Sequence, residues 1–254
     1  MIDLTGKVAL ITGSSRGIGQ GCAVEMAQAG ADIAINYNTH PEDAEVVAQQ
    51  IGAMGRKTAT IQADVSNRAA VDTMVAQAVS ELGRLDIVVC NAYYSHRGPF
   101  LELPVEGVQR TLDVCLLGSF HAAQAGARQM VAQGEGGSIL FISSVHAVVP
   151  VPGSLAYNAA KAGINHMSAT IASELAPNRI RSNVIEPGWI DTPGERTTMS
   201  AEALAAEGDK LPWKRMGTIE DIGRAATFLV SGAADYVTGS IFRVDGGFCL
   251  RMPE

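Results

Sequence analysis

Three polar side chains in the second half of the chain have the types and spacing of a proton-transfer site. Tyr157 and Lys161 are four residues apart, which places them on one face of a helix, and Ser144 lies upstream. A nearby ammonium group favours the phenolate and moves a tyrosine pKa from about 10 toward neutrality. A general acid or base works best there, and the serine hydroxyl then holds a substrate oxygen within reach. The trio predicts acid–base chemistry on that oxygen.

A Tyr-x-x-x-Lys spacing also occurs in ordinary exposed helices, so its surroundings decide its meaning. Residues 7–12 predict a buried strand, a glycine-rich turn follows, and small apolar residues then recur at helical spacing. Gly13 permits the tight turn, Gly17 lets backbone amides approach a pyrophosphate, and Gly19 allows close packing of the helix. The positive end of that helix faces the phosphates. The alternative is a flexible turn, but the strand and helix favour a dinucleotide site built from Gly13, Ser15, Arg16, Gly17, Ile18 and Gly19.

With these motifs, the chain resembles the short-chain dehydrogenase/reductase family. Similar motifs run in the family's order over about residues 4 to 249: Asp64-Val65, Cys90-Asn91-Ala92, the run from Pro187 to Thr192, Val237-Thr238-Gly239 and Val244-Asp245-Gly246-Gly247. The resemblance implies an enzyme that interconverts a secondary alcohol and a carbonyl with NAD or NADP. It is strongest to the branch that holds glucose 1-dehydrogenases and 3-oxoacyl-carrier-protein reductases.

The resemblance also assigns roles to single residues. Tyr157 donates the proton, Ser144 polarises the substrate oxygen, and Lys161 lowers the tyrosine pKa while it grips the nicotinamide ribose. Ile190 and Thr192 orient the carboxamide. Tyr157 and Lys161 are also implied in cofactor binding, and the other positions are Asn36, Asn38, Asp64 (the adenine-contacting acid), Val65, Asn91, Ala92, Pro187 and Gly188.

The chain departs from the family's pattern at two positions. Tyr93 follows Asn91-Ala92, where the family usually has a glycine, and a tyrosine disfavours positive φ. We therefore expect this loop to run differently and to bring an aromatic ring near the nicotinamide. Cys115 occupies the position of the family's fourth catalytic residue, an asparagine that helps to hold a water linking the lysine to solvent. A cysteine keeps the backbone carbonyl but loses the amide, so this candidate catalytic position implies a weaker proton relay.

The end of the second predicted strand bears on the choice of cofactor. Tyr37 falls where NAD-preferring members of the resembling family place an aspartate, so no carboxylate repels a 2′-phosphate there. Arg16 can meet that phosphate with its guanidinium fork, although a solvated loop arginine is the alternative. The pattern favours NADP, with NAD as the second choice.

The whole chain of 254 residues predicts one α/β domain, a Rossmann-type doubly wound fold over residues 1–254. Seven apolar runs alternate with helical segments, which implies a seven-stranded parallel sheet with helices on both faces. The expected strands are near 7–12, 32–37, 57–62, 85–90, 137–142, 180–185 and 240–244, and the expected helices are near 18–29, 42–54, 68–82, 106–133, 155–176 and 219–231. Residues 193–214 are interrupted by proline and glycine, and we expect a substrate lid near them. A disordered surface loop is the alternative.

Charge and composition exclude several classes of function. The formal net charge is −7 without any basic block, which argues against nucleic acid and against a membrane surface. No apolar stretch approaches the ~20 residues that span a bilayer. The N-terminus lacks the layout of a signal peptide, and the four scattered cysteines fit reduced thiols, so we expect a cytoplasmic protein. No cysteine or histidine has metal-ligand spacing, so we expect no metal centre.

Substrate and partners are less constrained by the sequence. We expect a small alcohol or carbonyl substrate, with a sugar or polyol favoured because an acidic carrier protein would meet an acidic enzyme. His96 and His146 are candidates for the pocket, or else ordinary surface histidines. Small residues on two long helices (Ala122, Ala125, Gly126, Ala159, Gly163 and Ala169) predict a homotetramer, because such helices form a two-fold interface in the resembling family. Packing within one subunit is the alternative. A different class of function, kept open by Tyr93 and Cys115, is a dinucleotide-binding sensor or scaffold.

Overall fold

Seven short apolar runs form one parallel sheet in the computed structural model, which describes residues 2–197 and 199–250. The strands are β1 Val8–Ile11, β2 Asp32–Tyr37, β3 Thr58–Gln62, β4 Ile87–Cys90, β5 Gly137–Ile142, β6 Ile180–Pro187 and β7 Ile241–Val244. Their order is β3-β2-β1-β4-β5-β6-β7, and every neighbouring pair is parallel. The predicted doubly wound α/β fold is confirmed.

The connections between the strands are helices, because parallel neighbours require a crossover. They are α1 Gly17–Gln28, α2 Pro41–Gly52, α3 Arg68–Leu82, α4 Val105–Leu112, α5 Gly118–Gln133, α6 Leu155–Leu175, α7 Ala201–Asp209 and α8 Ile219–Val230. One expectation differs from the structure. The single helix predicted near 106–133 is divided into α4 and α5 by a π-helical turn, Asp113–Leu117. A π-turn widens the helix by one residue, which leaves the apolar pattern readable and therefore hides it in the sequence.

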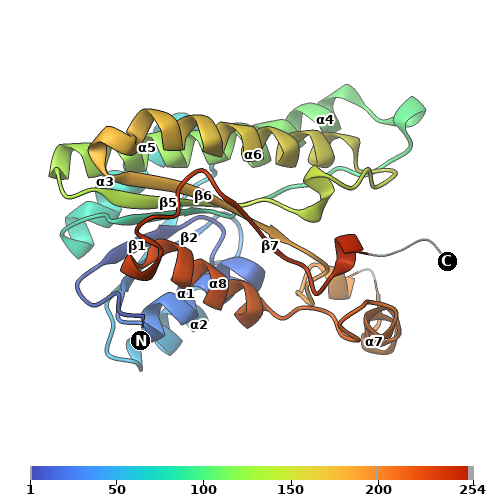
Figure 1. Cartoon of the computed structure of the whole chain (residues 1–254), viewed down its shortest axis with the longest axis horizontal. Coiled ribbons are helices and arrows are strands. Elements are labelled where there is room, and N and C mark those ends of the chain that lie inside the picture. The colour runs from blue at the N-terminus through green and yellow to red at the C-terminus, as the bar shows by residue number, and fades with distance from the viewer. Residues whose placement is uncertain (1, 198, 251–254) are drawn as a thin grey trace.

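The helices cover both faces of the sheet. Figure 1 shows α3, α5 and α6 on one side and α1, α2 and α8 on the other. The first side buries a core that includes Phe141, Met130 and Ile164, and the second buries one that includes Ile35 and Met26. Because both faces are covered, the inner strands β1, β4 and β5 are buried on both sides, as their apolar sequences indicated, whereas the edge strand β7 is largely exposed.

The order of the strands reverses between β1 and β4, which lie side by side in the sheet. In an open parallel sheet this switch point leaves a crevice outside the carboxyl ends of the strands, where ligands bind. The loops after β1, β4, β5 and β6 all leave from this edge. They carry most of the residues that the sequence singles out.

The segment near 193–214 contains a short helix, α7. It has a small apolar core of its own, in which Leu204, Leu211 and Met216 are buried and Trp189 packs against them. Figure 1 shows α7 set apart from the two helical layers. Its role as a lid remains a prediction.

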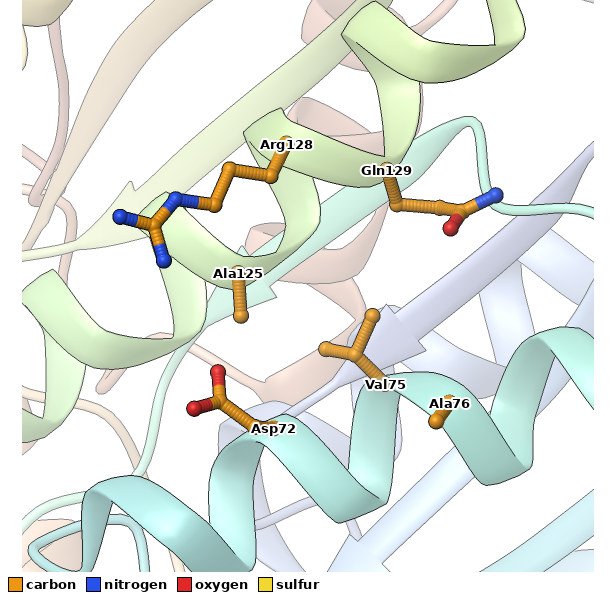
Figure 2. A pocket seen from close by; sticks show the side chains of 6 residues that line it. All are labelled: Asp72, Val75, Ala76, Ala125, Arg128 and Gln129. Atoms are coloured by element: carbon orange, nitrogen blue, oxygen red, sulfur yellow. The ribbon is translucent and has the colours of Figure 1, made fainter.

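A hollow of about 290 Å³ lies elsewhere on the molecule, between α3 and α5. Figure 2 shows Asp72, Val75, Arg128 and Gln129 around it, with the carboxylate of Asp72 and the guanidinium of Arg128 on opposite sides. None of the predicted site residues lines this hollow.

In the described part of the chain, no helix is long and apolar enough to cross a membrane. The same residues contain no group of three or more His, Cys, Asp or Glu side chains able to hold a metal ion.

Candidate active site

A buried cluster of hydrogen bonds joins the ends of β1 and β4 at the switch point. The Thr12 hydroxyl accepts from the backbone N–H of Asn91 (2.9 Å) and of Ala92 (3.0 Å), and it donates to the carbonyl of Val89 (3.3 Å). The Asn91 side chain donates in return to the carbonyls of Thr12 (2.9 Å) and Gly13 (3.0 Å). This junction fixes the loop after β4 against the glycine-rich turn.

The glycine-rich turn has the shape that the sequence predicts. Gly13 and Gly17 have φ of +62° and +61°, a region that L side chains rarely adopt. A Cβ on Gly19 would lie 2.4 Å from the Gly13 carbonyl oxygen and 2.5 Å from the Asn91 amide nitrogen. No side chain caps the N-terminus of α1 and its first turn has no acidic residue, so the backbone amides there can bind an anion. The turn therefore fits a dinucleotide pyrophosphate.

The residues at the end of β2 divide into two groups. Asn36 is 1% exposed and accepts from the Gly13 N–H (3.0 Å), while its amide donates to the carbonyl of Ala63 (3.1 Å). Its side chain therefore shapes the glycine turn and is not free for a ligand. Asn38 and Arg16 are exposed beside it, and Tyr37 is partly buried. Between Asn36 and His40 this edge has no carboxylate.

Asp64 and Val65 follow β3 and are held by other parts of the protein. The Asp64 carboxylate accepts from Arg110 (2.8 Å) and from the Ser66 hydroxyl (2.7 Å). Burial acts to raise the pKa of Asp64, but these hydrogen bonds outweigh it and hold the pKa below its usual value. Val65 is buried, and a Cβ on Gly118 would lie 2.6 Å from its side chain. An adenine contact by Asp64 would have to share a carboxylate that is already bound.

The loop after β6 forms the opposite wall. Gly188 packs so closely against Asp245 that a Cβ added to Gly188 would lie 2.6 Å from the Asp245 Cα. Ile190 forms a parallel β-bridge with Gly217. Thr192 reaches across to the glycine turn, because a Cβ on Gly17 would lie 3.9 Å from the Thr192 side chain. The remaining predicted cofactor residues also lie at the carboxyl edge: Ser15 and Ile18 around the start of α1, Ala92 after β4 and Pro187 at the end of β6.

Ser144, Tyr157 and Lys161 come together from β5 and α6. Ser144 follows β5, and its hydroxyl accepts from the His146 N–H (3.2 Å) and contacts the Tyr157 side chain. The Lys161 ammonium donates to the carbonyl of Ile142 (2.6 Å) and lies 5.3 Å from the centre of the Tyr157 ring. The three side chains of the predicted proton-transfer site are therefore neighbours.

The electrostatics of this trio differ from the sequence-based expectation. Burial raises the pKa of Tyr157, and the contact with Ser144 opposes it only in part. Burial likewise lowers the pKa of Lys161, which is 2% exposed. The sequence predicts a Tyr157 pKa drawn toward neutrality by Lys161, whereas in this structure the ammonium lies over the ring and desolvation raises that pKa. At neutral pH the phenol is protonated, as a proton donor must be.

His146 belongs to the same site. Its ring meets the Tyr157 ring edge-on, with centroids 5.3 Å apart, and its Nδ1 lies 2.9 Å from Asn158 Oδ1. Because the Asn158 amide donates to the carbonyl of Val151 (3.0 Å), its oxygen is the acceptor and Nδ1 carries the proton. Burial lowers the pKa of His146, so the ring is neutral near pH 7. Its Nε2 is left as a hydrogen-bond acceptor.

The two departures from the family's pattern have distinct surroundings. The Cys115 thiol is fully buried and donates to the Tyr94 carbonyl (3.1 Å), and it accepts from the Tyr94 N–H (3.4 Å). The thiol therefore holds the loop after β4 through the backbone of Tyr94. The backbone carbonyl of Cys115 accepts a hydrogen bond from the Ser119 hydroxyl (2.6 Å). Tyr93 is 60% exposed, and its hydroxyl lies 2.8 Å from where a Cβ on Gly194 would be. The aromatic ring thus stands between the loop after β4 and the segment near 193–214.

Sequence reasoning missed two residues that position the site. Thr12 precedes the glycines of a motif in which only the glycines drew attention. Asn158 sits between Tyr157 and Lys161, and its contacts with His146 and Val151 depend on a loop that no pattern describes. A polar residue directly after the catalytic tyrosine was the one signal available.

Comparisons with known proteins agree with this geometry. The sequence model of the family described as Enoyl-(Acyl carrier protein) reductase matches residues 13–249. The chain is 36% identical to glucose 1-dehydrogenase 2 of Bacillus subtilis, over 98% of this chain and 96% of that protein. It is 34% identical to a 3-oxoacyl-(acyl-carrier-protein) reductase of Synechocystis sp., over 98% of this chain and 100% of that protein. A gluconate 5-dehydrogenase of Burkholderia cenocepacia, solved in complex with NADP and tartrate, aligns with a TM-score of 0.90 at 32% identity, covering 98% of each chain.

The tight contact at Gly19 generates a test of the dinucleotide site. Gly19→Ala places a methyl group against the Gly13 carbonyl and the Asn91 amide, and such overpacking costs about 1–3 kcal/mol. We expect NADPH binding, measured by calorimetry, to weaken at least about tenfold. Gly52→Ala is the matched control, since a Cβ there meets nothing within 4 Å. Unchanged affinity in Gly19→Ala would show that the turn does not hold the nucleotide.

Proposed function

The chain belongs to the short-chain dehydrogenase/reductase family and is an NAD(P)-dependent oxidoreductase of alcohols and carbonyls, and we propose that it interconverts a secondary hydroxyl and a carbonyl of a small sugar-like substrate, with NADP as the preferred cofactor. The observation that carries the proposal is the contact of Tyr157 with Ser144 and Lys161 at the edge of the sheet where the glycine turn also lies. When bound there, the nicotinamide supplies or accepts the hydride.

The residues of the chain then divide the remaining work. Tyr157 moves the proton at the substrate oxygen, since its raised pKa keeps the phenol protonated for the reductive direction. The Ser144 hydroxyl, beside the phenol, donates to the same oxygen and stabilises its developing charge. Lys161 is held by the Ile142 carbonyl, and its charge favours the phenolate that forms in the course of the transfer.

A sugar-like substrate is supported by the polar groups around Tyr157. His146 offers an unprotonated ring nitrogen, and hydroxyl groups are suitable donors to it. The relative named glucose 1-dehydrogenase 2 supports the same class. The second candidate is a 3-oxoacyl-carrier-protein reductase, which the relative from Synechocystis sp. supports. A net charge of −7 disfavours it, because the carrier proteins are also acidic.

The raised pKa of Tyr157 predicts opposite pH profiles for the two directions. Oxidation needs the phenolate as a base, so its rate should rise as the pH increases above neutrality, whereas reduction should stay flat and fall only at high pH. Lys161→Met should shift the rise of the oxidative profile to higher pH, because the phenolate loses its nearby cation. Absorbance of the reduced nicotinamide measures both.

Tyr157→Phe is the control for these profiles. It should lower turnover about 10²- to 10⁴-fold in either direction of the reaction, while the protein still binds NADPH. Full activity in Tyr157→Phe would contradict the proposed role. Dinucleotide binding without turnover of any alcohol or carbonyl by the unmodified protein would instead favour a sensor or scaffold.

The preference for NADP predicts the effect of changes at Tyr37 and Arg16. Tyr37→Asp places a carboxylate near the 2′-phosphate and should raise the dissociation constant of NADPH, but not of NADH, at least about tenfold. Arg16→Gln should likewise weaken the binding of NADPH and not that of NADH. Calorimetric titration of both cofactors decides the matter. A wild-type protein that binds NADH more tightly would overturn the preference.

We also propose that the chain assembles as a homotetramer. Leu117 and Phe120 expose apolar side chains at the start of α5, and Ile241 and Phe242 do so on the edge strand β7. An apolar edge strand of this kind is an aggregation hazard unless it is covered. Part of the predicted helix interface differs from the structure. Ala122 is buried and Gly126 packs against Val88, so these two small residues fit α5 onto the sheet.

Light scattering tests the tetramer at micromolar concentration. We expect four times the mass of the chain, and Phe120→Arg should reduce it to twice that mass, because a charge replaces an apolar contact on only one of the two surfaces. Val46→Arg, on the exposed face of α2, is the control and should leave the mass unchanged. A monomeric wild-type protein would rule the assembly out.

A further inference from the structure

Arg97 lies in a part of the loop after β4 that is fixed on both sides. The N–H of His96 donates to the Thr111 hydroxyl (3.1 Å) in α4, and the N–H of Gly98 donates to the carbonyl of Gly153 (3.0 Å). The His96 ring also packs on Gly107, and a Cβ added to Gly107 would lie 2.6 Å from the ring. The exposed Arg97 side chain therefore starts from a defined backbone position.

The same frame holds the catalytic tyrosine. Gly153 belongs to the loop between His146 and α6, and the carbonyl of Val151 in that loop accepts from the Asn158 amide. Asn158 in turn orients the His146 ring, whose edge meets Tyr157. A chain of direct contacts therefore connects the backbone beside Arg97 to the side chain that moves the proton.

Arg97 places a positive charge on the loop beside this site. No described residue forms a hydrogen bond or an ion pair with the Arg97 guanidinium, whereas Arg84, Arg110, Arg196 and Arg215 each pair with a carboxylate. Burial dominates the pKa values of Tyr93, His146 and Tyr157, and the Arg97 cation lowers all three. The opposing charge is Glu195, whose carboxylate accepts from the Trp189 indole (3.0 Å).

We propose that Arg97 binds a carboxylate on the substrate, so that the substrate class is small polyhydroxy acids and not neutral sugars. The guanidinium fork matches a carboxylate through two parallel hydrogen bonds, and its fixed backbone leaves less freedom to lose on binding. His146 Nε2 then accepts from a hydroxyl of the same molecule. This inference rests on the proposed oxidoreductase function, because it assigns the end of the substrate that does not react.

Two matched pairs of compounds test the inference by binding as well as by turnover. D-Gluconate and D-glucitol share a six-carbon chain and differ by one carboxylate, and D-threonate and D-threitol repeat the comparison with four carbons. Calorimetry on the NADPH-loaded protein should show at least one acid binding about 10- to 100-fold more tightly than its polyol. Arg97→Gln should abolish that preference and leave polyol binding unchanged, and Arg97→Lys should restore part of it.

Arg179→Gln is the control, since Arg179 directly precedes β6 at the opposite edge of the sheet and pairs with Asp235. It should keep the preference for the acid. Equal binding of acid and polyol in both pairs, or a preference that survives in Arg97→Gln, would overturn the inference. Tyr157-dependent oxidation of a polyol without any preference for the acid would leave the proposed function standing. Acid-selective binding without oxidation of any alcohol would refute the proposed function and retain the anion site.

Discussion

The hydroxyl of Thr12 is the point on which the rest of the site depends. It accepts two backbone N–H groups of the loop after β4 and donates to the end of β4, so it joins the two strands between which the sheet reverses its order. Asn91 completes the junction by donating to the carbonyls of the glycine turn. Both residues are buried, and a buried backbone N–H without an acceptor is costly, about 1–3 kcal/mol each. The junction therefore sets where the glycine turn and the loop carrying Tyr93 and Arg97 stand relative to each other.

Burial sets the chemistry of the second half of the site. The turn of α6 that carries Tyr157 and Lys161 packs on the end of β5, and the lysine uses the Ile142 carbonyl as its partner. Desolvation disfavours both the phenolate and the ammonium, so burial raises the pKa of Tyr157 and lowers that of Lys161. Arg97 and Glu195 act on the phenol of Tyr157 from different loops. With the proposed role of Arg97, substrate selectivity and proton transfer are coupled through the same few groups.

The alternation of apolar runs and helical segments was enough to predict the fold, because parallel strands and their crossovers leave few other arrangements. The glycine turn and the Ser144, Tyr157 and Lys161 trio were also evident, since their chemistry depends on local spacing. What the sequence could not supply was long-range geometry. The position of the lysine over the ring, the buried side chain of Asn36 and the hydrogen bond from Gly98 to Gly153 all depend on how segments far apart in the chain meet. The π-turn at Cys115 was hidden for a different reason, because one extra residue does not interrupt a helical pattern.

The junction at Thr12 holds the glycine-rich turn and the loop after β4 in one arrangement. The most direct measurement is the NADPH dissociation constant of Thr12→Val beside that of Thr12→Ser. Valine keeps the shape but leaves two buried N–H groups without their acceptor, whereas serine keeps the hydroxyl. We expect Thr12→Val to weaken NADPH binding at least about tenfold, and Thr12→Ser to bind NADPH about as tightly as the wild type does. Wild-type affinity in a folded Thr12→Val protein would contradict it.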